Sequence, residues 1–285
     1  MVRAAYGLYL ERQDRRKEAL AELAQAERID PGNSFVLALS LDGATASVVV
    51  AESPSFHAVT NALTLEAWVQ PSSLYPTPGS VNSILRKNVK AGAENFFLRI
   101  RNTEGPSLVE FGLGRQLGVM GAACEMRTNQ WCHLAATYDG QTVAVLVNGS
   151  VIGSKRTSGS LVIGASELVI GRGDPEYSSG EYFHGVLDEI RVWNVARSQA
   201  QIGTAMKGPL TGKEAGLVAN WNFDDSTPAD FAGHGNTGRL QGNARFVEVP
   251  RPATLAGVGA GSRTAEQTSV VSHKWLVFRC AQNGL

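Results

Sequence analysis

From Ser34 onward, apolar and polar residues alternate in many short segments of the chain. A period of two is typical of a β-strand with one buried face. The turn dipeptides Asp139-Gly140 and Asn148-Gly149 predict two successive tight hairpins, because glycine adopts positive φ without strain. Many strands with frequent turns predict a mainly β chain folded as an antiparallel sandwich or barrel. The predicted strands span residues 35–41, 46–51, 63–70, 81–87, 95–101, 107–113, 116–124, 131–138, 142–148, 150–155, 167–171, 183–193, 216–222 and 243–248.

The first 33 residues have a helical pattern instead. Small or apolar residues recur at the spacing of one helix face, at Ala19, Leu20, Leu23, Ala26 and Ile29. Pro31 ends this helix, and a shorter helix before Gln13 completes a predicted hairpin over residues 1–33. The hairpin resembles a single tetratricopeptide repeat, with small residues at Gly7 and Ala19 where two helices meet. One repeat cannot bury its own face, so the hairpin is predicted to end an array or to cap the next domain.

Residues 34–250 are predicted to form one β domain, followed by a C-terminal tail over residues 251–285. The tail is rich in Gly, Ala, Ser and Thr and has no period. It ends in one apolar run, HKWLVFRCAQNGL, for which an edge strand and a disordered segment are both open.

Charge and composition exclude several classes of partner. Lys and Arg total 26 and Asp and Glu total 26, so the net charge is zero and no nucleic-acid partner is predicted. No apolar run approaches the roughly 20 residues of a membrane-spanning helix, and the N-terminus lacks the apolar stretch of a secretory signal. The cysteines, Cys124, Cys132 and Cys280, lack metal-type spacing. Cys124 and Cys132 are interpreted as ordinary buried thiols, with pairing across a hairpin as the alternative.

The stretch GVLDEIRVWNVARSQAQI, residues 185–202, contains adjacent carboxylates. Strand alternation predicts that Asp188 shares the apolar face and points inward as an anchor, whereas Glu189 and Arg191 form the solvated face. Ser198 is predicted to cap the following short helix, with Gln201 completing a capping box.

Five segments in sequence order together resemble the laminin-G-like, or concanavalin-A-like, jelly roll, close to the pentraxins. They are LSLDG (39–43), LTLEAWVQP (63–71), QWCHLAATYDGQTVAVLVNG (130–149), GVLDEIRVWNVARSQAQI (185–202) and GLVANWNFDD with GHGNTGRLQG (216–242). The resemblance implies a two-sheet jelly-roll sandwich that binds sugars, proteins or lipid head groups, often with calcium. It also implies an extracytoplasmic location.

The chain departs from this family at two places. Ala44 and the residues after it replace an acidic strand start, which removes one carboxylate that a calcium site could use. The stretch EAWVQ lacks the cysteine that in pentraxins bridges to the strand holding Cys132, so that bridge cannot form.

Calcium is the candidate cofactor, with Asp42, Gly43 and Asp188 as candidate ligands. Calcium requires six to eight oxygen ligands. The first and last strands of jelly rolls often lie side by side, which would let Asp42 and Asp188 share one ion with the carbonyl of Gly43. The alternatives are that Asp42 caps its own turn and that Asp188 is a buried carboxylate accepting backbone N–H groups.

Three tyrosines in polar, turn-like surroundings are the candidate ligand-binding residues: Tyr75, Tyr177 and Tyr182. Loops of a sandwich cluster at its ends, so these rings could line one rim and stack on a sugar.

Hydrolysis is not predicted. Glycosidases need two carboxyls at defined separation, but Asp188 and Glu189 are adjacent on a strand and Glu66 has no acidic neighbour two residues away. The sequence therefore predicts a non-catalytic recognition module for glycan or protein ligands. A scaffold that combines helical repeats with the sandwich is the first alternative, and a glycosidase-like enzyme is the second.

Overall fold

A computed structural model of the chain describes residues 35–74, 79–89, 93–173, 181–250 and 252. The predicted hairpin of residues 1–33 and nearly all of the predicted tail, residues 251–285, lie outside these ranges and stay predictions.

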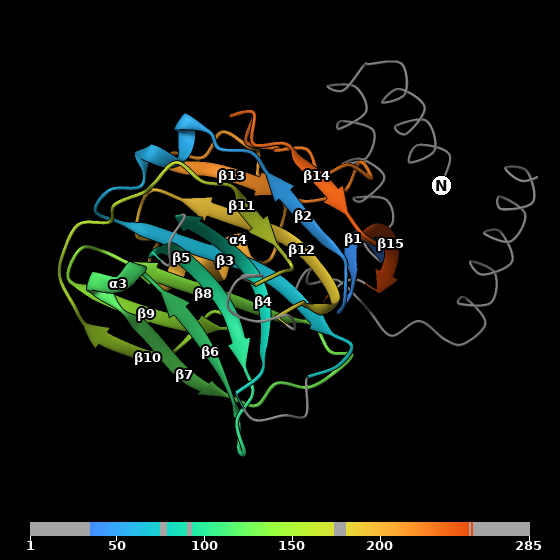
Figure 1. Cartoon of the computed structure of the whole chain (residues 1–285), viewed down its shortest axis with the longest axis horizontal. Coiled ribbons are helices and arrows are strands. Elements are labelled where there is room, and N and C mark those ends of the chain that lie inside the picture. The colour runs from blue at the N-terminus through green and yellow to red at the C-terminus, as the bar shows by residue number, and fades with distance from the viewer. Residues whose placement is uncertain (1–34, 75–78, 90–92, 174–180, 251, 253–285) are drawn as a thin grey trace, which may run out of the picture. The chain divides into compact units, whose positions relative to one another are not determined.

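The described residues form two antiparallel sheets that pack face to face (Figure 1). Sheet A has the order β10 (Ser150–Arg156), β9 (Thr142–Val147), β8 (Cys132–Tyr138), β3 (Leu63–Pro71), β12 (His184–Trp193), β1 (Phe35–Asp42) and β15 (Arg245–Pro250), and β13 (Leu217–Trp221) also pairs with β12. Sheet B has the order β14 (Gly238–Gln241), β2 (Ser47–Val50), β11 (Leu168–Ile170), β4 (Val81–Val89), β5 (Ala93–Arg101), β6 (Ser107–Gly112) and β7 (Val119–Cys124). The described helices are short: η1 (Pro54–Ala58), α3 (Gly114–Leu117) and α4 (Gln199–Ala205).

The predicted fold class is confirmed: the protein is mainly β, with two antiparallel sheets forming a sandwich. Each predicted strand overlaps an observed one, whereas β14 was not predicted and residues 114–117 form α3. The hairpin between β9 and β10 turns through Asn148 and Gly149, both with positive φ (49° and 77°). Two successive positive φ angles match the twist of the flanking strands, which is why Asn-Gly is favoured there.

The space between the sheets is filled by one apolar core. Leu39, Val69 and Leu187 enter it from sheet A at paired positions, and Leu98 and Phe111 enter it from sheet B. Fully burying each such side chain stabilises the fold by about 1.5–3 kcal/mol, so the alternation of apolar residues determines which sheet faces meet.

Helix α4 lies on the opposite, outer face of sheet A. Its Ile202 packs with Ala135 and Leu146 in a small apolar cluster separate from the main core. The predicted capping box is confirmed, because the Ser198 side chain accepts the N–H of Gln201 and the Gln201 side chain accepts the N–H of Ser198. Among the described residues, no helix has the length and apolar character that crossing a membrane requires.

Gly112 provides a test of packing on sheet B. A Cβ atom at this position would lie 2.0 Å from the ring of Phe97, which is buried beneath Arg99. Gly112→Ala is expected to lower the free energy of unfolding by about 1–3 kcal/mol in urea denaturation. Gly121 on the next strand is the matched control, because its Cβ would make only ordinary contacts, at 3.6 Å and beyond. Equal losses in the two variants would contradict the packing argument.

Candidate functional site

A bulge in β12 determines where its charged residues lie. Asp188 pairs with Trp68 and Arg191 pairs with Glu66, so Glu189 and Ile190 together oppose one residue of β3. Glu189 has a φ of 49°, the left-handed conformation that accommodates the extra residue. Leu187 before the bulge and Ile190 after it both enter the main core.

The predicted inward position of Asp188 is therefore wrong, whereas Ile190 faces the core and Arg191 lies on the outer face as predicted. The extra residue reverses the alternation, so Asp188 shares the outer face of sheet A with Trp68 and does not point into the core. Arg191, predicted to be solvated, is completely buried, and Glu189 is 8% exposed. The sequence reasoning missed the bulge because no glycine or proline marks it.

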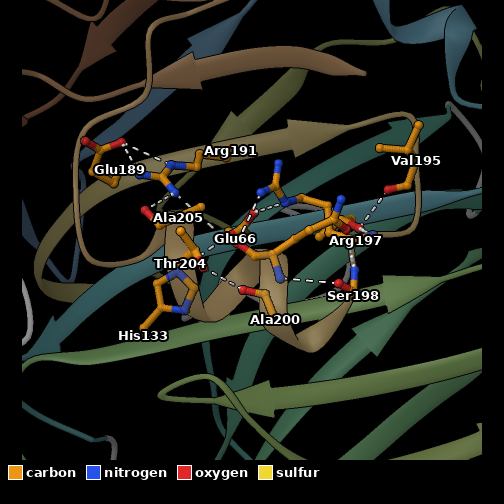
Figure 2. A network of polar contacts seen from close by, with 12 residues as sticks. Glu66, His133, Glu189, Arg191, Val195, Arg197, Ser198, Ala200, Thr204 and Ala205 are labelled. Carbon is orange, nitrogen blue, oxygen red and sulfur yellow. Dashed lines mark hydrogen bonds and ion pairs between the residues drawn. The ribbon is translucent and has the colours of Figure 1, made fainter. Parts of the chain in front are cut away.

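Arg191 is the centre of a buried polar network on this outer face (Figure 2). Its guanidinium donates to Glu189 Oε2 at 2.9 and 3.1 Å and to the carbonyl of Ala205 at 3.0 Å. Its Nη1 also lies 3.8 Å from Glu66 Oε2. Burial would lower the pKa of Arg191, but Glu189 and Glu66 raise it above its ordinary value.

Glu66 lies between three basic side chains and is itself completely buried. Its carboxylate is 3.5 Å from His133 Nε2, 3.8 Å from Arg191 and 3.6 Å from Arg197 Nε. Burial raises the pKa of Glu66, but His133, Arg191 and Arg197 outweigh this effect and lower it overall. Burial lowers the pKa of His133 more than Glu66 raises it, so its imidazole stays neutral at neutral pH.

In the structure, Asp188 is a buried carboxylate that accepts a backbone N–H group, which was the alternative to calcium binding. Its Oδ1 accepts the backbone N–H of Glu189 at 2.8 Å. Burial, together with the charges of Glu189 and Asp224, raises the pKa of Asp188 well above its ordinary value. A carboxyl in this setting favours its protonated form.

Asp42 and Asp188 do not meet. Strands β1 and β12 do pair, as the resemblance implied, but Asp42 lies opposite His184, four residues from Asp188. At about 3.4 Å per residue, this register separates the two positions by roughly 14 Å along the strand. The predicted shared ion site is therefore not formed by this pair.

The Asp42 carboxylate caps its own turn. Oδ1 accepts the N–H groups of Ala44, Thr45 and Ala46, and Oδ2 accepts from Thr45 Oγ1 and Asn243 Nδ2, all at 2.8–2.9 Å. Gly43 follows with a φ of 74°. In the part of the chain that the structure describes, no three His, Cys, Asp or Glu side chains converge on a metal position. Calcium binding by this chain stays a prediction.

A pocket of about 440 Å³ opens at one end of the sandwich. The β3–β4 and β7–β8 connections cross between the sheets there, and the β5–β6 turn lies beside them. Its lining combines an apolar part, Leu74, Pro106 and Met126, with polar groups of Asn102, Thr103, Ser107, Glu125 and Arg127.

The loops around this rim pocket are held by hydrogen bonds. Thr103 Oγ1 donates to the carbonyl of Pro106 at 2.8 Å, and the Asn102 side chain bonds Ser80 and Ser107. The backbone N–H of Asn129 donates to the carbonyl of Pro71 at 2.7 Å, which fixes the β7–β8 connection to the end of β3. The pocket is thus built on ordered turns at a rigid edge.

Of the three candidate tyrosines, the structure describes Tyr182 alone. Tyr182 is half-buried, forms an isolated bridge with Arg172 and does not line the rim pocket. Tyr75 and Tyr177 lie outside the described residues, although Tyr75 directly follows the pocket residue Leu74. Sequence reasoning missed Glu125 and Arg127, since no local pattern marks loops that meet only in the folded chain.

The two described cysteines are free thiols, but both are half-buried, whereas the sequence was interpreted as burying them. Both pack against the main core, and Cys124 Sγ lies 3.8 Å from Met126 Sδ. Burial, with a contribution from Cys124, raises the pKa of Cys132 to about 12. A thiol must ionise to act as a nucleophile, so the raised pKa disfavours the reactive form of Cys132 at neutral pH.

Comparison with known families identifies the fold. The laminin G model of the concanavalin A-like lectin/glucanases superfamily matches residues 42–203, which is more than half of the chain. The chain belongs to this superfamily. A search of curated proteins found no match.

Solved structures are similar to this chain at low sequence identity. A protein from Bacteroides ovatus, proposed to bind carbohydrate, is 20% identical with a TM-score of 0.59, and the alignment covers 78% of this chain and 62% of that protein. A heptameric pentraxin from Limulus polyphemus is 16% identical with a TM-score of 0.47, over 59% of this chain and 81% of the pentraxin. The chain thus spans less than two thirds of the Bacteroides protein.

Removing Arg191 tests the buried network. Arg191→Met leaves Glu66 and Glu189 buried with less compensation and frees the carbonyl of Ala205, so we expect a loss of about 3–5 kcal/mol in the free energy of unfolding. The exposed Arg156 on β10 provides the control Arg156→Met, for which a change within about 0.5 kcal/mol is expected in the same urea denaturation. A loss below about 1 kcal/mol for Arg191→Met would show that the network does not hold this face together.

Asp42 gives the fold an acid-sensitive turn. Burial raises its pKa, but the N–H groups of Thr45, Ala44 and Ala46 outweigh this and hold it well below the ordinary value. A carboxyl with a depressed folded-state pKa contributes stability above its unfolded pKa of about 3.8, and this contribution is lost as the pH falls further. As the pH is lowered from about 5 to about 2, the free energy of unfolding of Asp42→Asn should therefore fall less than that of the unmodified protein, as measured by urea denaturation. The exposed Asp225, which caps a turn through Thr227, supplies the control Asp225→Asn. The same reduction in the control would rule out a specific role for Asp42.

Proposed function

We propose that this chain is a non-catalytic carbohydrate-recognition module that binds its glycan in the rim pocket. The observation that carries the proposal is the composition of the pocket, in a domain of the lectin/glucanase superfamily. An apolar part at Leu74 and Met126 faces hydroxyl, amide, carboxylate and guanidinium groups. This combination suits a sugar ring, which presents an apolar C–H face and a rim of hydroxyl groups.

Three further observations support recognition over hydrolysis. Glu125 is the single carboxylate lining the pocket among the described residues, whereas hydrolysis of a glycosidic bond requires a pair. Glu66 and Asp188 lie beneath side chains on the outer face of sheet A and are inaccessible to a polysaccharide. The Bacteroides ovatus protein of the same fold is likewise proposed to bind carbohydrate.

A glycan array with the labelled full-length chain tests this proposal. Binding to a defined class of glycans is expected, followed by calorimetry with the best ligand. Running the array with calcium and with a chelator determines whether binding depends on calcium.

Variants of the pocket locate the site. Glu125→Ala and Arg127→Ala remove exposed groups that hold no structural contact among those described, so each should weaken glycan binding by about tenfold without loss of folding. Glu167→Ala and Arg156→Ala are matched controls outside the pocket and should bind as the unmodified chain does. Unchanged affinity in both pocket variants would place the site elsewhere, and binding to proteins without any glycan would favour the scaffold alternative.

A further inference from the structure

The outer face of sheet A carries buried polar atoms that have no hydrogen-bond partner. Among the described residues they include both carboxylate oxygens of Glu66, both ring nitrogens of His133, both side-chain polar atoms of Asn220, Trp193 Nε1 and Arg197 Nε. By strand register, Asn220 shares this face with Arg191, and His133 shares it with Trp68. Buried polar groups are usually paired, so this concentration marks a layer that is unfavourable in its closed form.

One segment covers this polar layer. Residues 194–216, which include α4, run from the end of β12 to the start of β13, and we call them the strap. Figure 2 shows α4 beside Glu66, His133 and Arg191. Removal of the strap would admit water to the unpartnered atoms of Glu66 and His133.

Hydrogen bonds hold the strap on both sides of α4, and Arg197 adds an ion pair with Glu66 and a contact with the ring of Trp193. Near its start, Thr64 Oγ1 donates to the carbonyl of Val195 at 2.8 Å and accepts the N–H of Arg197 at 2.9 Å. Near the end of α4, Arg191 donates to the carbonyl of Ala205 at 3.0 Å and Trp68 Nε1 to that of Met206 at 3.3 Å.

Three apolar side chains of α4 and its C-cap hold the helix down. They are Ile202, Ala205 and Met206, and the outward side of the strap borders an open pocket of about 480 Å³. Segments with few buried apolar contacts open at lower free energy than the core strands do.

His133 couples this opening to pH. Its side chain is 1% exposed, and its ring centroid lies 5.2 Å from that of Trp68, which hydrogen-bonds the strap at Met206. Protonating the imidazole in the closed layer places a third positive charge beside Arg191 and Arg197, with Glu66 as the nearest anion. Opening the strap lets water solvate this charge, so acid favours the open form.

We propose that the strap is an acid-released cover, opened by protonation of His133 while the sandwich remains folded. This conformational device goes beyond carbohydrate recognition at the rim pocket and does not depend on it. Opening would uncover Trp68, Glu66 and His133, an aromatic ring with polar partners, on a face that is closed at neutral pH.

The charged groups around His133 define the pH window. They are Glu66 from β3, Glu189, Arg191 and Asp188 from β12, Arg197 from the strap, and Asp224 after β13. Glu66 has a lowered pKa and acts in the same direction as His133 but at lower pH. Asp188 has a raised pKa, so its contribution grows as the pH falls and opposes release. Release therefore begins below about 6.5, where a solvated histidine starts to protonate.

Hydrogen–deuterium exchange of the full chain tests the proposal, with rates converted to protection factors to remove the intrinsic pH dependence. The reporters are the amides of Ile202 and Met206, which bond Ser198 and Ile202 within α4. From about pH 6.5 downward, their protection is expected to fall by up to about tenfold for each pH unit, and by less where protonation of Asp188 opposes release, until the folded-state pKa of His133 is reached. Amides of Leu39 and Leu65 in the core strands are expected to keep their protection.

Two variants separate His133 from other titrating groups. His133→Gln should abolish the pH-dependent loss in α4, whereas the exposed His234→Gln should retain it. In the unmodified chain, the imidazole resonance of His133 should titrate below 6.5, at the pH where the loss of protection levels off, which tests the proposal even if His133→Gln fails to fold. The proposal is overturned if the loss persists in His133→Gln, if core and strap amides lose protection together, or if the protection of α4 stays constant between pH 6.5 and the pH at which His133 titrates.

Discussion

Strand β12 pairs with β1, β3 and β13, so its bulge at Glu189 constrains the centre of sheet A. One extra residue allows Leu187 and Ile190 both to enter the core while Asp188 and Arg191 both lie on the outer face. A charged side chain on that face must be paired or protonated once it is covered. The ion pairs of Arg191, the neutral His133 and the raised pKa of Asp188 all follow from this placement.

The molecule has two polar regions of different kinds, the buried network and the rim pocket. In the network, side chains from β3 and β12 hydrogen-bond the strap over sheet A, and their burial excludes a large ligand. In the rim pocket, short turns joined by hydrogen bonds present polar groups to solvent at the end of a rigid sandwich. Loops on such a scaffold carry recognition in many β-sandwich proteins, because they vary without disturbing the core. Polar loops at the end of a sandwich are consistent with the membership of this chain in the concanavalin A-like lectin/glucanase superfamily.

Much of the fold could be predicted because alternation and turn chemistry act locally. Apolar residues at every second position mark the strands, and the turn at Asn148-Gly149 requires positive φ, which both residues tolerate. The capping box at Ser198 and Gln201 was predictable for the same reason, since its donors and acceptors lie within three residues. Asp42 was correctly recognised as a candidate turn cap, but its separation from Asp188 depends on the register between β1 and β12. Neither strand encodes that register by itself.

The sequence by itself determined that the chain is an antiparallel sandwich with its apolar residues facing inward. Alternating apolar side chains define the buried face of a strand, whichever strand becomes its neighbour. The tertiary structure decided which charged residues are buried. Arg191 reads as a surface residue in the sequence, yet α4 covers it, and Glu66 becomes its neighbour only through the pairing of β3 with β12. The rim pocket likewise exists because connections distant in sequence meet at one end of the two sheets. Electrostatic and binding properties depend on distances between segments, and folding alone fixes these distances.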